Sequence, residues 1–296
     1  DQEIFTGSSG RVFPKSMKAS PLLRSWLIRL SNKGVTFYRN WKWVGWQDDV
    51  AAFETISGKK FVKSHTTVLA MGGASWPHLG SDGLWADILK KSNVNITNFQ
   101  PSNMGFKVQW SDFMKPFFGT PIKSVRISSG EFSAIGEFVI SKKGIEGSGI
   151  YAASKFLRDG NSLMIDLLPD TEIETLNKRQ KLLSLKVSRS TLNRKVLRLN
   201  KGNTAFFNEF SQHISTQNIV HAAKNLLIPH EGPHPINEAI STAGGVSVSA
   251  LNDNLMLKAK PSIFCAGEML DWEAPTGGYL ISACLATGKW AGLGAV

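Results

Sequence analysis

Residues 263–279 read Ile-Phe-Cys-Ala-Gly-Glu-Met-Leu-Asp-Trp-Glu-Ala-Pro-Thr-Gly-Gly-Tyr, and this stretch decides the fold class. The apolar start predicts a buried strand that ends at Gly267 and Glu268, and the glycine pair 277–278 predicts the start of a helix. A carboxylate suits sugar-like hydroxyl groups, and the free N–H groups of a helix start suit an anion. A helix start that uses glycine only for packing is the alternative.

A second glycine pair follows another apolar run. Residues 66–73 read Thr-Thr-Val-Leu-Ala-Met-Gly-Gly, which predicts a buried strand and then a turn. Glycines at the carboxyl end of a strand let the backbone approach a ligand, although such turns also occur without one. A ligand with a delocalised negative charge, such as the reduced ring of a flavin, is stabilised by a helix N-terminus aimed at it.

The rest of the chain has an α/β texture at both ends and a different middle. Residues 101–166 read as strand fragments separated by Gly, Pro and Ser, and residues 171–225 read as helical and basic. This order predicts one α/β domain interrupted by an insertion. The flanking elements are expected as helices at 19–33 and 84–91, as strands at 35–38, 41–46, 50–55, 60–62 and 66–71, and as a last helix from 278.

The 296 residues carry a net charge of +11, with 34 Lys and Arg against 23 Asp and Glu. A net positive charge attracts phosphate, nucleic acid or anionic membrane, and it does not discriminate among these partners. Residues 178–201 hold nine basic residues and no acid, interleaved with leucines and valines that include Leu185. A solvated amphipathic helix is favoured there over a nucleic-acid contact. Core packing explains tryptophans such as Trp26 and Trp43 more simply than base stacking.

Cysteine and histidine usage predicts no metal site. Cys265 and Cys284 lie in apolar runs and are expected as buried, reduced thiols. His230 and His234 are four residues apart, but Gly232 and Pro233 between them break any helix, so a zinc site is disfavoured. No apolar run is long enough for a membrane span and no secretory signal opens the chain, so a cytoplasmic location without membrane contact is expected.

Residues 147–152 imitate a dinucleotide-binding fingerprint. Gly-Ser-Gly-Ile-Tyr-Ala fits G-x-G-x-x-A, and Asp166 follows at nearly the expected distance. The glycines should directly follow a buried strand, whereas six residues separate them from the strand at 138–140. A loop-to-helix turn is therefore predicted instead of a nucleotide site.

Several segments together resemble the bacterial FAD-binding oxidoreductases known as aminoacetone-oxidase-like or BaiN-like flavoproteins. The resemblance runs in order along nearly the whole chain, which makes it more specific than any single motif. Its segments are Gly-Arg-Val-Phe-Pro at 10–14, Ala-Met-Gly-Gly-Ala-Ser-Trp-Pro at 70–77, Gly-Ser-Asp-Gly at 80–83, Gly-Ile-Glu-Gly-Ser-Gly at 144–149, Ser-Thr-Ala-Gly-Gly-Val at 241–246, Ala-Gly-Glu-Met-Leu-Asp at 266–271 and Gly-Gly-Tyr at 277–279.

The resemblance implies an α/β fold in which a Rossmann-like FAD-binding domain is interrupted by a β-barrel-like insertion. The FAD-binding domain is expected at 1–100 and 251–296, and the insertion at 101–250 with a helical subdomain at 171–234. The family's first strand, its G-x-G-x-x-G loop and the acid that holds the ribose have no counterpart after Asp1. The chain is therefore expected to be truncated at its N-terminus and to bind FAD poorly by itself.

The resemblance also implies a flavin oxidoreductase that moves a hydride to or from flavin N5 on a small organic substrate, with NADH or NADPH as a candidate donor. Reduction of a conjugated enone and oxidation of a small amine both stay open. So do two other classes: a basic nucleic-acid-binding protein and an FAD-binding scaffold without turnover. Neither a catalytic acid or base nor the oligomeric state is identified.

The residues implied at the cofactor come from four segments. The turn at 70–73 would line FAD through its backbone, Glu268 would hold the ribityl chain, and Arg11 would face the flavin or the substrate. Trp43 stands at the adenine, where relatives carry a small aliphatic residue. The full set is Arg11, Trp43, Ala70, Met71, Gly72, Gly73, Gly267, Glu268, Pro275, Thr276, Gly277, Gly278 and Tyr279.

Overall fold

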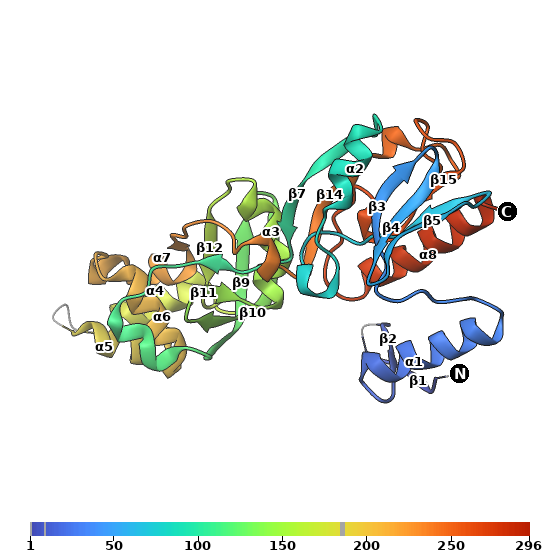
Figure 1. Ribbon diagram of the computed structural model, residues 1–296. Helices are drawn as coiled ribbons and strands as arrows, with labels where there is room; N and C mark the ends of the chain where they lie inside the picture. Colours follow the sequence, from blue (N-terminus) through green and yellow to red (C-terminus); the bar gives the residue numbers. More distant parts are fainter. Residues whose placement is uncertain (1, 9, 184–186) are drawn as a thin grey trace.

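The computed structural model describes residues 2–8, 10–183 and 187–296 (Figure 1). Asp1 and Ser9 of the opening stretch, and Leu185 and Lys186 of the basic run, lie outside the described residues. Within the described residues, no helix is both long and apolar enough to cross a membrane.

A parallel strand pair forms the centre of the α/β part. β6 (Thr67–Leu69) pairs with β15 (Ile263–Cys265), although nearly 200 residues of sequence separate them. An antiparallel meander of β3 (Lys42–Gln47), β4 (Val50–Thr55) and β5 (Gly58–Val62) precedes β6, and α2 (Trp85–Lys91) follows it. One hydrophobic core holds these elements together; it includes Trp43, Leu69, Trp85, Leu89, Val246, Cys265 and Met269.

Two long strands lead from the α/β part to the middle of the chain. β7 (Ile96–Ser102) and β14 (Ser241–Val246) are antiparallel, with a bulge between Ala243 and Gly245. Figure 1 shows this pair between the two bodies of the molecule. The insertion therefore leaves the α/β part on one strand and returns on its neighbour.

The inserted part is built on a six-stranded antiparallel sheet in the order β13-β12-β9-β10-β11-β8. The edge strands β13 and β8 do not pair with each other, so the sheet is a curled half-barrel and not the closed barrel that the term β-barrel-like suggests. α3 (Ser148–Arg158) packs against β9 and β10 (Figure 1). The strands are β8 (Phe106–Lys107), β9 (Pro121–Ser129), β10 (Phe132–Ser141), β11 (Gly144–Glu146), β12 (Leu163–Asp166) and β13 (Leu226–Ile228).

Short helices follow β12, as the sequence predicts. They are α4 (Ile173–Lys181), α5 (Arg189–Leu192) with a π-helical turn at Asn193–Leu197, α6 (Lys201–Ser211) and α7 (Ile219–Lys224). Phe206 and Phe207 of α6 are fully buried in a second hydrophobic core that runs from Met104 to Ala239. β13 lies inside the range expected to be helical, yet it completes the sheet beside β12. The domain boundaries at 100 and 250 stay predictions.

The N-terminal segment differs most from the expectation. α1 (Ala19–Asn32) forms as predicted, after the hairpin of β1 (Ile4–Thr6) and β2 (Val12–Pro14), but none of its residues is buried. The prediction that Trp26 packs in the core is therefore wrong, since its side chain is 45% exposed. Figure 1 shows no sheet against α1 except that hairpin.

The strand expected at 35–38 is also wrong. Val35 donates its N–H to the carbonyl of Leu30 in the turn that ends α1, and none of the described strands pairs with the residues that follow. β-branched and aromatic residues favour a strand only where a neighbouring strand supplies hydrogen bonds. α8 (Tyr279–Gly294) closes the described chain, with its first residue after the predicted glycine pair.

Candidate functional site

The two glycine-containing turns lie side by side at one edge of the α/β part. Because β6 and β15 are parallel, their carboxyl ends meet, and the N–H of Ala266 donates to the carbonyl of Leu69 at 2.9 Å. Ala70, Met71 and Gly72 therefore lie next to the turn that carries Gly267. The structure brings together two predicted motifs at the position where α/β sheets bind ligands.

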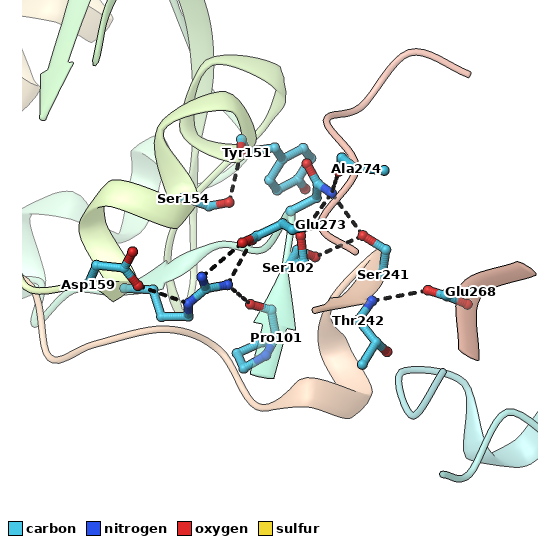
Figure 2. Close-up of polar contacts among 12 residues, drawn as sticks. Pro101, Ser102, Tyr151, Ser154, Asp159, Ser241, Thr242, Glu268, Glu273 and Ala274 are labelled. Atoms are coloured by element: carbon cyan, nitrogen blue, oxygen red, sulfur yellow. Dashed lines mark hydrogen bonds and ion pairs between the residues drawn. The ribbon is translucent and has the colours of Figure 1, made fainter. Parts of the chain in front are cut away.

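Glu268 ties three segments together. Its Oε2 accepts from the N–H of Gly73 at 3.3 Å, and its Oε1 accepts from the N–H of Thr242 at 3.0 Å (Figure 2). Thr242 in turn accepts from the N–H of Ala74 at 2.9 Å. A Cβ on Gly73 would overlap Thr242, so only glycine allows this approach. Each oxygen keeps a lone pair, so the carboxylate has a fixed position and can still accept from a ligand hydroxyl.

The N-terminus of α8 is open. Gly277 and Gly278 have φ values of +111° and +93°, and the helix begins at Tyr279 without a side-chain cap or an acid in its first turn. The guanidinium of Arg11 lies against Gly277, in the space that a Cβ would need. Helix starts carry a partial positive charge and free N–H groups. With Arg11 beside them, Gly277, Gly278 and Tyr279 form a site suited to an anion.

The chain just before this site is fastened to the inserted part. Arg158 of α3 donates twice to the carboxylate of Glu273, at 2.7 and 3.0 Å, and once to the carbonyl of Pro101 at 2.9 Å. Asn103 donates to the carbonyl of Ala274 at 2.7 Å and to the hydroxyl of Ser241 at 2.8 Å. Figure 2 shows this network next to the Thr242–Glu268 contact. Pro275 and Thr276 therefore connect an anchored segment to the helix start.

Sequence reasoning missed Arg158, Asn103 and Glu273. Arg158 and Glu273 are 115 positions apart, and Asn103 and Ala274 are 171 apart. No local spacing signals contacts of this kind. A basic residue in the last turn of an amphipathic helix also reads as an ordinary charge near a helix C-terminus.

Trp43 lines a pocket of about 610 Å³ together with Met71, Trp85 and Ile88. Its ring packs edge-on against Trp46, with 4.8 Å between the ring centroids. Trp85 donates its indole N–H to the carbonyl of Gly72 at 3.0 Å, which connects the pocket to the glycine turn. The buried hydroxyl of Ser75 has no hydrogen-bond partner among the described residues.

These groups fit a flavin dinucleotide. An aromatic and apolar pocket beside the 70–73 turn suits a flat base, a fixed carboxylate suits sugar hydroxyls, and the positive start of α8 suits the anionic edge of a reduced flavin ring. Across residues 2–8, 10–183 and 187–296, no G-x-G-x-x-G loop follows a parallel strand. The fit to FAD therefore rests on the pocket for the flat base, the carboxylate at the strand edge and the positive start of α8.

A helix starts at Ser148 as predicted, but the strand β11 directly precedes Gly147, whereas the sequence predicted that six residues separate these glycines from the nearest strand. β11, which precedes Gly147, is antiparallel to its neighbours, and Gly147 with φ +110° simply starts α3. The carboxylate of Asp166 pairs with Lys224 at 2.7 Å and accepts from the N–H of Leu168. The Asp166 carboxylate therefore already has its polar partners within the inserted part.

The thiols and histidines have separate surroundings. Both cysteines are free; burial raises the pKa of Cys265 to about 12, and burial together with the charge of Glu268 raises the pKa of Cys284. Burial lowers the pKa of His230, whose Nδ1 accepts from the N–H of Gly232 at 3.2 Å. Among the described residues, no three His, Cys, Asp or Glu side chains form a group that could hold a metal.

The basic run divides into an inner and an outer set. Arg179 and Arg189 turn inward, where they donate to the carbonyls of Val196 and of Ser211 and Ile214. The other described cations of the run are exposed, as predicted for a solvated face: Lys178, Lys181, Arg194, Lys195, Arg198 and Lys201.

Comparison with known proteins places this geometry in context. The model of the "HI0933-like protein Rossmann domain" matches residues 1–294. The 3-dehydro-bile acid delta(4,6)-reductase of Clostridium scindens is 23% identical over 313 aligned positions, which cover 98% of this chain and 76% of the relative. The ribosomal RNA dihydrouridine synthase of Escherichia coli K12 is 23% identical over 225 positions, which cover 72% of this chain and about half, 56%, of that relative.

Proposed function

Because this chain belongs to the HI0933-like protein family with a Rossmann domain, we propose that it is a flavin-dependent reductase of carbon–carbon double bonds conjugated to a carbonyl group. The family match confirms the Rossmann-type fold class and the resemblance to flavoproteins of this kind. It supports an oxidoreductase with a flavin cofactor in general. The direction of the reaction and the type of bond are the proposal.

The observation that carries the proposal is the anion site at the start of α8. A flavin that accepts two electrons becomes negatively charged on the pyrimidine side of its ring, and when bound it supplies the hydride. The N–H groups after Gly277 and the Arg11 guanidinium lie where such a charge would be stabilised. The anchored 273–274 segment holds this helix start in place before any ligand arrives.

The remaining predicted contacts belong to the same proposal. The turn at 70–73 would line the cofactor through its backbone, Glu268 after Gly267 would accept from ribityl hydroxyls, and Trp43 and Met71 would form the base pocket. Pro275 and Thr276 would border the flavin ring. NADH or NADPH is proposed as the electron donor, and a small organic molecule as the substrate.

The names of both relatives describe the same chemistry. One is a delta(4,6)-reductase of a 3-dehydro-bile acid, and the other forms dihydrouridine in ribosomal RNA. Uracil loses its C5=C6 double bond when it becomes dihydrouracil, and that bond is conjugated to the C4 carbonyl. Hydride adds to such a bond because the carbonyl group accepts the displaced electron pair. These names therefore favour reduction of a conjugated double bond over oxidation of an amine.

The first experiment uses the complete gene product. Its absorbance spectrum is recorded, the protein is denatured and any released chromophore is identified. Released FAD is expected, followed by anaerobic bleaching with NADH or NADPH and reoxidation by a simple cyclic enone. A protein that stays colourless with added FAD contradicts the cofactor. A flavin that an amine bleaches, and that oxygen but no enone reoxidises, contradicts the reaction.

The six exposed cations of the 178–201 run favour a second candidate, in which the conjugated bond belongs to a uracil base in RNA. A basic surface on a protein that also carries a reductase site would bind the phosphate backbone, and affinity would then fall steeply with salt. The expected result is binding of an RNA oligonucleotide whose log–log salt slope reports several phosphate contacts.

A variant with Lys178, Lys181, Arg194 and Lys195 changed to glutamine should flatten that slope by roughly 0.7 per lost contact with single-stranded RNA. The matched control changes two exposed lysines of β5, Lys59 and Lys60, to glutamine and should leave the slope unaltered. RNA affinity that is absent at low salt contradicts this candidate and leaves the small-molecule substrate.

A further inference from the structure

Titratable side chains gather around Gly105, two residues after Asn103, which contacts the loop before α8. A Cβ on Gly105 would lie 2.8 Å from Cγ of Glu146 and 3.1 Å from Cε1 of His234, so both side chains contact this glycine. Tyr151 lies in the first turn of α3, five residues after Glu146, and the charge of Glu146 acts on its phenol. None of these groups is needed for the cofactor contacts described above.

The helical spacing of α3 directs Tyr151 toward the segment before α8. Tyr151, Ser154 and Arg158 lie on one face of α3, at spacings of three and four residues. Arg158 contacts Pro101 and Glu273 at one end of that face, while Glu146 contacts Gly105 near the other end.

Asn103 lies between these two contacts in the sequence and donates to the carbonyl of Ala274. Because α3 packs against β7, the strand that ends just before Asn103, this face of α3 carries Tyr151 toward the side of the half-barrel where Asn103 contacts Ala274, three residues before Gly277. In Figure 2 the Tyr151 ring points toward the segment that carries Ala274.

We propose that Tyr151 is the proton donor of the reduction, which rests on the proposed function. A bound flavin, reduced by the donor, would supply the hydride for the new C–H bond at the β-carbon, and the π-electron pair of the double bond would move toward the carbonyl oxygen to give an enolate. The O–H bond of Tyr151 then breaks, and its proton forms the second C–H bond at the α-carbon. The phenolate regains a proton from solvent, so the substrate gains two hydrogens and the flavin loses two electrons.

The surroundings keep the phenol in its protonated form. Burial and the Glu146 carboxylate both raise the pKa of Tyr151, which outweighs the opposite effect of a backbone contact at Gly147. The phenol is therefore protonated at neutral pH. The other titratable group at this point is His234, buried against Gly105, with Glu238 at 3.9 Å from its Nδ1 and Lys143 paired to Glu238.

The kinetic test is Tyr151→Phe in the complete gene product. Enone reduction should fall by about 100-fold or more, since general acids contribute about 10² to 10⁴ to a rate. Flavin reduction by the donor, and reoxidation by ferricyanide, which takes electrons without forming a C–H bond, should stay within about twofold. The control Tyr38→Phe, at an exposed tyrosine, should change neither rate.

Two kinetic outcomes overturn the proposal: an enone rate within threefold of the unsubstituted protein, or an equal loss with ferricyanide, which would indicate a structural role. A protein without bound flavin or enone turnover instead contradicts the proposed function. A second measurement does not depend on turnover. The ¹³Cζ-tyrosine NMR signals of the three tyrosines in these 296 residues are assigned by single Tyr→Phe variants.

The Tyr151 signal should titrate above the ordinary range of a tyrosine phenol, and Glu146→Gln should move its titration to lower pH. Added FAD should shift the Tyr151 signal and leave that of Tyr38 in place. If Tyr151 titrates in the ordinary range and its signal ignores FAD while that of Tyr279 responds, Tyr151 is not at the flavin and the proposal fails.

Discussion

Arg158 and Glu273 form a two-point ion pair, with 2.7 Å from Nη1 to Oε1 and 3.0 Å from Nη2 to Oε2. The side chains are 10% and 21% exposed. The pair joins α3 of the half-barrel to the segment that leads into α8. It therefore connects the part that carries Tyr151 to the part that carries the anion site.

Loss of Arg158 should destabilise the protein strongly. Arg158→Met leaves the Glu273 carboxylate largely buried and without its partner, which should lower the free energy of unfolding by about 3 kcal/mol. Urea unfolding measures this change. Lys115→Gln breaks an exposed pair with Asp112, where the side chains are 68% and 91% exposed, and should cost less than about 1 kcal/mol. Equal losses of unfolding free energy in the two variants would contradict the prediction that the Arg158–Glu273 pair stabilises the protein more than an exposed pair does.

Glu268→Gln should weaken the strand-edge site. The side-chain amide has one acceptor atom, whereas the carboxylate accepts from both Gly73 and Thr242, so one backbone N–H loses its partner. The expected cost is about 1–3 kcal/mol, with a lower flavin content of the purified protein. Glu131→Gln changes an exposed acid and should alter neither measurement. Unchanged stability and flavin content for Glu268→Gln would contradict this reading of the carboxylate.

Gly277→Ala and Gly288→Ala should have opposite effects on the stability of the protein, although the two glycines lie close together in the chain. Gly277 has φ +111° and Arg11 occupies the space of a Cβ, so alanine there should destabilise by about 1–2 kcal/mol and reduce flavin binding. Gly288 lies inside α8 with open space around it, so alanine should stabilise by about 0.5–1 kcal/mol. Thermal unfolding and flavin titration report both effects. Two variants of the same sign would contradict the prediction.

Stability should fall as the pH drops below about 6.5. Burial lowers the pKa of His230 in the folded protein below its ordinary value of 6.5. Below 6.5 the unfolded chain therefore binds a proton that the folded protein resists, which favours unfolding. His230→Gln should reduce the pH dependence of the unfolding midpoint between pH 5 and 7, whereas His213→Gln at an exposed site should not change it. An unchanged pH profile for His230→Gln would assign the effect to other groups.

The sequence by itself determined the local parts of this protein. Apolar runs that end in glycine predicted β6, β15 and the start of α8, and the glycines could be recognised because positive φ angles and close backbone approach need them. The basic amphipathic stretch predicted short helices with exposed cations. Family resemblance added the interrupted Rossmann order. Each of these signals lies within a few neighbouring residues or follows chain order.

Only the tertiary structure decided which distant residues meet. Trp26 and residues 35–38 have the composition of core and strand, yet Trp26 stays 45% exposed and none of the described strands pairs with 35–38, because burial and strand pairing depend on what the rest of the chain places alongside. Arg158 meets Glu273 across 115 residues, and Asn103 meets Ala274 across 171. Local propensity encodes neither contact, since each exists only after the half-barrel has docked against the strand edge that holds Glu268.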